Sequence, residues 1–163
     1  MSKFDHKNID KAHALISSHI VKTPLVSNDY INEITGGNIF FKLENLQLTG
    51  SFKIRGALNK INQLSHLERN NGLVAYSSGN HAQAVAYASK INNINSKIVM
   101  PKNAPQIKIQ NTRNYGAEVV LYDPKSEKRA REINGWYHMG VSCSSGEHDS
   151  RKVVVLSEIV NQS

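Results

Sequence analysis

The sequence predicts an α/β fold in which a parallel β-sheet and its flanking helices form three layers. Short apolar runs with strand character alternate along the chain with amphipathic stretches of helical periodicity, a pattern typical of parallel sheets. Two residues that mark helix limits agree with this pattern, because Pro105 stands at an expected first helical position and Gly116 just past the end of the same helix. No internal repeat or low-complexity linker interrupts the alternation.

The N-terminal elements follow from periodicity and from the residues that break it. An amphipathic helix is expected over residues 8–20, where Ile9, Ala12, Leu15, Ile16 and Ile20 share a face, and it ends before Pro24. A short helix over 28–34 ends at the Gly36-Gly37 turn, and the apolar run after that turn predicts a strand over 39–43.

The remaining elements alternate regularly. Strands are expected over 73–76, 97–100 and 118–122, where apolar residues form short continuous runs. Helices are expected over 52–64, over the alanine-rich segment 80–91, and over 105–115.

Composition sets loose limits on function. The 163 residues suffice for one ordinary core, and a hydrophobic content of 39% is typical of a soluble globular protein. We expect no membrane partner, because neither a bilayer-spanning run nor a signal-peptide apolar core is present, and a cytoplasmic location follows by default. The single cysteine, Cys143, agrees with a reducing compartment.

The charge and the histidines point to neither a nucleic-acid nor a metal site. The net charge is +7, but the lysines stand singly, without a basic cluster that contains aromatic residues, so nucleic-acid binding is not expected. His138, Cys143 and His148 are five residues apart. This spacing matches no zinc pattern and lacks a clear fourth ligand, so no metal site is predicted.

Lys53 is the strongest candidate for a reactive residue. It follows Ser51 and Phe52 at an expected helix start, where Ser51 is the expected N-cap. The helix macrodipole and partial burial against Phe52 would both disfavour an ammonium ion at this position. A neutral amine is the form that attacks an aldehyde.

A second candidate segment runs from Ser77 to His81 and contains Ser78, Gly79 and Asn80. It lies between the strand expected at 73–76 and the helix expected at 80–91. Ligands of open parallel sheets bind at such turns, and the N–H groups of the new helix can receive a carboxylate or a phosphate. The two serine hydroxyls and the Asn80 amide add polar groups to this predicted substrate-binding loop.

Several motifs in order resemble those of the threonine dehydratase and serine racemase group, within the fold-type II (tryptophan synthase β-like) pyridoxal-phosphate enzymes. The resemblance extends to about Asp123. It rests on the segments Thr23-Pro24-Leu25, Lys42-Leu43-Glu44-Asn45-Leu46-Gln47, Gly50-Ser51-Phe52-Lys53, Ser77-Ser78-Gly79-Asn80-His81-Ala82-Gln83, Ile98-Val99-Met100-Pro101, Ala104-Pro105 and Tyr115-Gly116-Ala117-Glu118-Val119-Val120.

The resemblance implies pyridoxal 5'-phosphate as cofactor and a role for each matching residue. Lys53 would form the internal aldimine and, once released, act as the base at the substrate Cα. Phe52 would pack beside the cofactor ring, and Asn80 would hydrogen-bond the ring hydroxyl. The loop from Ser77 to His81 would hold the substrate carboxylate, with Ser78 on the ring face opposite Lys53, and His81 is given no part in proton transfer.

The implied activity is that of a threonine or serine ammonia-lyase, which removes water from a hydroxy amino acid and yields an α-keto acid and ammonia. Isoleucine biosynthesis is an implied metabolic role. A serine at position 78, where many threonine dehydratases have alanine, leaves serine racemase open as an alternative, and hydroxyaspartate ammonia-lyase is a third possibility.

The resemblance covers only the N-terminal half of such an enzyme. Residues 1–123 would belong to its core, with about 48–123 in the small domain, whereas residues 124–163 form a divergent tail that one hypothesis attributes to an altered reading frame or early stop. The family's glycine-rich phosphate loop is not recognisable, since Gly36-Gly37 is the one adjacent glycine pair.

An incomplete core has consequences for the partners of the chain. The apolar strand Ile39-Phe40-Phe41 would lose its cover and invite pairing with another chain. Two further possibilities therefore stay open: a homo-oligomer, and a catalytically silent remnant that acts at most as an interaction module with a full-length homologue.

Overall fold

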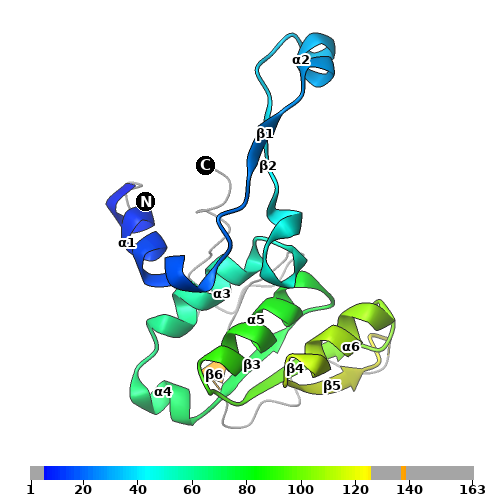
Figure 1. The fold of residues 1–163 in the computed structure, drawn as a ribbon. Helices are drawn as coiled ribbons and strands as arrows, with labels where there is room; N and C mark the ends of the chain where they lie inside the picture. The colour runs from blue at the N-terminus through cyan, green and yellow to red at the C-terminus, as the bar shows by residue number, and fades with distance from the viewer. Residues whose placement is uncertain (1–5, 126–136, 139–163) are drawn as a thin grey trace.

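The computed structural model describes residues 6–125 and 137–138. Its body is built on a four-stranded parallel sheet with strand order β5-β4-β3-β6, and a separate two-stranded antiparallel sheet, β1-β2, belongs to an arm that projects from the body (Figure 1). The predicted α/β class with a parallel sheet and flanking helices is confirmed. None of the described helices is long and apolar enough to cross a bilayer.

The parallel sheet consists of β3 (Leu73–Tyr76), β4 (Ser96–Pro101), β5 (Glu118–Tyr122) and β6 (Tyr137–His138). Helix α5 (Asn80–Ile91) connects β3 to β4, and helix α6 (Gln106–Asn114) connects β4 to β5. Consecutive strands are therefore neighbours, with Ala75 opposite Ile98 and Ile98 opposite Val119. Parallel pairing follows because each connecting helix returns the chain to the end at which the previous strand began.

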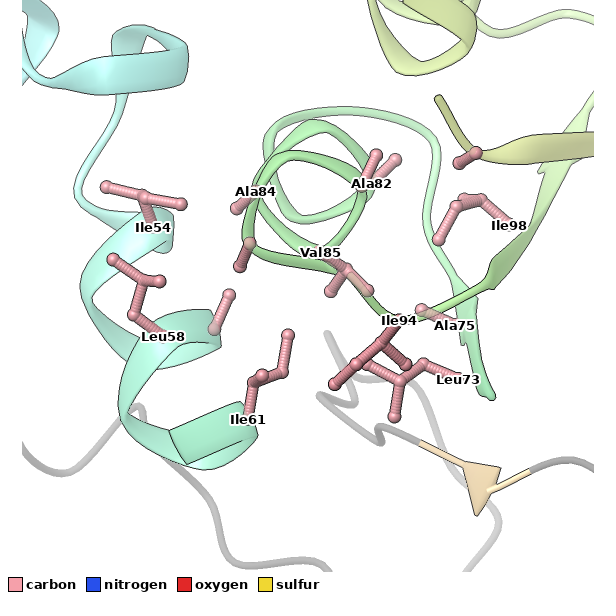
Figure 2. Close-up of a cluster of buried hydrophobic side chains, with 14 of the residues drawn as sticks. Ile54, Leu58, Ile61, Leu73, Ala75, Ala82, Ala84, Val85, Ile94 and Ile98 are labelled. Atoms are coloured by element: carbon pink, nitrogen blue, oxygen red, sulfur yellow. The ribbon is translucent and has the colours of Figure 1, made fainter. Parts of the chain in front are cut away.

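Helix α3 (Lys53–Asn62) packs against α5 through one apolar stripe. Ile54, Leu58 and Ile61 are fully buried and share a helix face, since they are four and three residues apart. Figure 2 shows these side chains pointing toward Ala84 and Val85 of α5. Removing one such side chain, as in Leu58→Ala, typically costs about 2–5 kcal/mol of stability.

Helix α5 lies at the centre of the body, in contact with α3, α6, β3 and β4. Its alanines at positions 82, 84, 86 and 88 are all fully buried. Small side chains on several sides allow neighbouring elements to approach closely, so this alanine-rich segment is a buried helix rather than a surface one. The opposite face of the sheet carries a second buried cluster made of Val74, Val99 and Tyr122.

The arm contains β1 (Leu25–Ser27), α2 (Asp29–Thr35) and β2 (Phe40–Lys42). Asn28 caps α2 by accepting a hydrogen bond from the Ile31 N–H at 3.0 Å, and Gly36 ends the helix in the left-handed conformation at φ 65°. The strand expected over 39–43 therefore exists but does not join the parallel sheet. It pairs instead with β1, a strand that the sequence analysis did not predict.

Further differences concern short elements. Helix α1 (His6–Ile16) is followed by a 3-10 turn, η1 (Ser17–His19), where one continuous helix to residue 20 was expected. Two more 3-10 turns, η2 (Glu44–Leu46) and η3 (Leu48–Gly50), precede α3, and the unpredicted helix α4 (His66–Asn70) follows it. Pro105 lies just before α6 rather than at its first position, and Gly116 beyond its end has φ 89° as expected.

Candidate active site

The two sequence-predicted segments start neighbouring helices. Lys53 is the first residue of α3, and Asn80 is the first residue of α5, with three residues between it and the end of β3. The η3 turn directly before α3 contacts α5. Ile54 in the first turn of α3 lies close to Ala84 of α5 in Figure 2. The predicted anion-binding turn therefore follows the carboxyl end of β3, and the predicted amine begins the helix that packs beside α5.

The side chain of Lys53 extends over the ring of its neighbour Phe52. The Lys53 Nζ is 5.0 Å from the ring centroid, and both residues are partly exposed. A ring face attracts a cation. This contact keeps the Lys53 amine beside the Phe52 ring.

The expected N-cap role of Ser51 is wrong. Phe52 occupies the cap position of α3 without a side-chain cap, and Ser51 is extended, with φ −165°. Its hydroxyl is buried and has no hydrogen-bond partner within the part of the chain that the structure describes. Serine is a favoured N-cap residue in the local sequence, but the turn before Ser51 directs its side chain inward instead.

That turn is strained. Thr49 has φ 66° and Gly50 has φ 68°, and the left-handed region is uncommon for a β-branched residue such as threonine. The Thr49 hydroxyl is also buried and unpaired among residues 6–125. Two unpaired hydroxyls, Thr49 Oγ1 and Ser51 Oγ, thus stand immediately before Lys53, which is the kind of polar lining that a bound polar ligand could satisfy. Thr49 was not among the sequence-predicted site residues, because strain of this kind cannot be read from residue types.

The turn between β3 and α5 is tied to the sheet. The Ser77 N–H donates to the Val99 carbonyl at 3.2 Å, and the Ser77 Oγ accepts from the Gly79 N–H at 3.1 Å. Ser78 is exposed. A Cβ added at Gly79 would meet no atom within 4 Å, so there is open space in front of this backbone.

Both helices begin without a capping side chain. The first N–H groups of an α-helix have no partner within the helix, and together with the macrodipole they form an anion-binding site. In α5 these groups follow the open space at Gly79. The side chain of His81 is buried at 8% exposure, in keeping with a structural role for that residue.

Asn80 is exposed and linked to α6. Its Oδ1 accepts a hydrogen bond from the Lys108 Nζ at 2.7 Å. Lys108 was not among the sequence-predicted site residues, because the contact joins residues 28 apart that meet only when α5 and α6 pack together.

A charged cluster joins the base of the arm to α3. Arg55 donates through Nε to Glu44 Oε2 at 2.8 Å and through a terminal nitrogen to Glu44 Oε1 at 2.7 Å, and the Thr23 hydroxyl donates to the same carboxylate. Burial alone would raise the pKa of Glu44. The hydrogen bonds from Arg55 and Thr23 and the charges of Arg55 and Lys42 outweigh burial, so the pKa lies below its usual value.

Within the described residues no group of three or more histidine, cysteine or acidic side chains could hold a metal ion. Cys143 and His148 lie outside those residues, as does the side chain of His138. What the site offers is an amine, two unpaired hydroxyls, an amide and an uncapped helix start. This donor set fits a ligand that carries an aldehyde together with anionic groups, as in the class of enzymes that attach a carbonyl cofactor to a lysine.

Comparison with known families agrees with this class. A family model described as pyridoxal-phosphate dependent enzyme matches residues 16–159, and the chain belongs to that family. Pyridoxal phosphate is therefore the cofactor to which this fold is suited.

The relatives of the chain include threonine dehydratases and serine racemases. The chain is 51% identical over 115 residues to the catabolic L-threonine dehydratase TdcB of Staphylococcus aureus (strain USA300), covering 70% of this chain and 33% of the relative. It is 46% identical over 128 residues to the serine racemase of Dictyostelium discoideum, covering 78% of this chain and 39% of the relative. Among solved structures, maize serine racemase matches with a TM-score of 0.70 and 42% identity over 73% of this chain and 36% of that one.

The chain thus spans between about a third and two fifths of the length of these relatives. The family match continues to residue 159, beyond the expected boundary at 123. The roles of Lys53, Phe52, Ser77, Ser78, Gly79, Asn80 and His81, like the domain boundary itself, stay predictions.

Proposed function

We propose that this chain supplies the amine and the anion-binding turn of a pyridoxal-phosphate-dependent ammonia-lyase that acts on threonine or serine. One observation carries the proposal: Lys53 begins α3 beside α5, whose uncapped start follows the open turn at Gly79. The similarity to a threonine dehydratase supports the choice of a hydroxy amino acid as substrate.

In this proposal each residue has a defined task. Lys53 binds the cofactor through Nζ, and its freed amine takes the proton from the substrate Cα. The N–H groups at the start of α5 and the hydroxyls of Ser77 and Ser78 bind the substrate carboxylate, which turns the Cα–H bond toward Lys53. Phe52 packs beside the cofactor ring, and Asn80 hydrogen-bonds the ring hydroxyl.

Bound pyridoxal phosphate supplies an electron sink for the pair left at Cα. The net reaction would remove water from the hydroxy amino acid and then hydrolyse the product to an α-keto acid and ammonia. Threonine, serine and hydroxyaspartate all carry the required hydroxyl. The relative is described as catabolic, so a catabolic role is favoured over the expected part in isoleucine biosynthesis.

Serine racemase is the second candidate, and the exposed Ser78 favours it. A hydroxyl on the face opposite Lys53 can return a proton to Cα with inverted configuration. Ser78→Ala is expected to lower racemisation of serine at least about tenfold, while deamination falls less, because general acid-base catalysis contributes on the order of a hundredfold or more. Chiral chromatography and a ketoacid assay on the same samples measure both rates.

The main test is a titration of the 163-residue protein with pyridoxal phosphate, followed by visible absorbance. The unaltered protein is expected to develop the absorbance band of a lysine-bound cofactor, and Lys53→Ala is expected to remove the band and any formation of α-keto acid. Lys90→Ala is the matched control, because Lys90 is an exposed lysine in the last turn of α5.

A band that persists in Lys53→Ala would contradict the assigned role of Lys53. Absence of a band in the unaltered protein would favour the remaining alternative, a silent remnant that pairs with a homologous subunit. Analytical ultracentrifugation then measures whether the chain forms a homo-oligomer.

A further inference from the structure

Two polar contacts join α5 to α6 along one seam. The Lys108 Nζ donates to Asn80 Oδ1 at 2.7 Å, and the Asn111 Nδ2 donates to Gln83 Oε1 at 3.0 Å. The partners within each helix are three residues apart, so the two contacts lie one turn from each other on the same helix faces. The first contact is at the start of α5, where the proposed cofactor contact also lies.

We propose that Lys108 is a positioning residue that fixes the orientation of the Asn80 amide toward the cofactor. This inference rests on the proposed function. An ammonium group has three donors and no acceptor, whereas an asparagine amide has one oxygen acceptor and one donating NH2 group. With Lys108 bound to Oδ1, a rotation of the amide by half a turn would place the NH2 group against the ammonium.

The consequence is that Asn80 Nδ2 becomes the end that faces away from Lys108. It makes no hydrogen bond to any residue that the structure describes, and it is free to donate. An oxygen on the cofactor ring requires a donor, so Lys108 selects the amide orientation that can bind it. The positive charge of Lys108 near the start of α5 also favours an anionic ligand there.

The contact is better explained by function than by helix packing. Gln83 is 2% exposed, so its bond to Asn111 is the buried one of the pair and suffices to set the register of the two helices. Asn80 is exposed, where a hydrogen bond adds little to stability. The backbone of Lys108 is anchored to a buried part of α6, because its carbonyl accepts a 2.7 Å hydrogen bond from the fully buried Thr112.

The test is a double-mutant cycle on the affinity for pyridoxal phosphate, measured by absorbance titration. Lys108→Met and Asn80→Ala are each expected to weaken binding about tenfold, the effect of losing one hydrogen bond to a charged or polar ligand group. The double variant is expected to bind no more weakly than Asn80→Ala alone. Lys108→Arg retains the donor and is expected to recover part of the loss.

Two controls separate positioning from charge and from folding. Lys102→Met removes an exposed positive charge just before α6 and is expected to leave affinity unchanged. The unfolding temperature of each variant without cofactor is expected to match that of the unaltered protein, and a Lys108→Met variant that loses stability is replaced in the cycle by Lys108→Leu.

The outcomes distinguish the two proposals. If the unaltered protein binds no cofactor, the proposed function fails and this inference fails with it. If the unaltered protein binds cofactor but the losses from Lys108→Met and Asn80→Ala multiply in the double variant, only the role of Lys108 is overturned. If Lys102→Met weakens cofactor binding as much as Lys108→Met does, Lys108 acts only through its charge, and its positioning role is likewise overturned.

Discussion

Gly79 has no side chain, and this leaves open space in front of the candidate site. A methyl group there would clash with no protein atom, so Gly79→Ala is expected to fold with nearly unchanged stability. The methyl group would occupy the space in front of the α5 start, and we expect the KM for threonine to rise about tenfold or more through lost carboxylate contacts. Steady-state kinetics and thermal unfolding measure the two effects.

Gly37→Ala is the matched control for this prediction. Its added methyl group would make ordinary contacts, the nearest at 3.8 Å to Ile39, and it lies in the arm rather than at the site. A large stability loss in Gly79→Ala, or an equal rise in KM in Gly37→Ala, would contradict the assignment of this space to the substrate.

At the residue scale, the sequence predicted what depends on neighbours along the chain. Lys53 at a helix start and the turn from Ser77 to Gly79 follow from local signals, and the structure has both. The Ser51 cap failed because the left-handed residues before it, Thr49 and Gly50, set the direction of its side chain. Lys108 could not be predicted, since its contact depends on how two helices pack.

At the scale of the elements, the stability of the 3-10 turns before α3 depends on the carboxylate of Glu44. Its pKa in the folded chain lies below the usual value, so its contribution to stability is complete above the unfolded-state pKa, as at pH 7, and is lost as pH falls through the folded-state pKa. Glu44→Gln is expected to lower the free energy of unfolding at pH 7 by about 1–3 kcal/mol, because Arg55 loses a charged acceptor. The difference should shrink toward pH 3.

Urea unfolding between pH 7 and pH 3 measures this difference. Glu33→Gln, an exposed change in α2, is the control and is expected to alter stability little at any pH. A Glu44→Gln deficit that stays constant down to pH 3 would show that ionisation of Glu44 contributes nothing.

Short elements were the ones that the sequence analysis missed, and the reasons differ. Strand β1 has three exposed residues and exists because it pairs with β2, so periodicity could not reveal it. Helix α4 is only five residues long, but Ser65 and Glu68 form a capping box in which the Ser65 N–H donates to Glu68 at 2.8 Å. That signature was present in the sequence and could have identified α4.

For the whole molecule, we expect the exposed apolar arm to be the main determinant of association. Leu25, Phe40 and Phe41 are 61%, 61% and 42% exposed, in line with the predicted loss of cover over this strand. The combined change Phe40→Ser and Phe41→Thr is expected to reduce aggregation several-fold, because exposed apolar strands at sheet edges pair with other chains. Light scattering at increasing protein concentration measures the effect.

Ile107→Ser is the control for the arm. Ile107 is 63% exposed on α6, as exposed as Phe40 but outside the two-stranded sheet. Equal reductions in scattering by the two variants would mean that general hydrophobicity, and not the arm, drives association.

The order of strands in the parallel sheet also bears on how the protein forms during synthesis. Strands β3, β4 and β5 are adjacent in space and successive in the chain, joined by α5 and α6. Contacts between near neighbours in sequence form quickly, since little loop entropy opposes them. We therefore expect the segment from Leu73 to Tyr122 to condense on the ribosome as one nascent unit, so that the turn at Ser77 takes shape before β6 is added at the far edge.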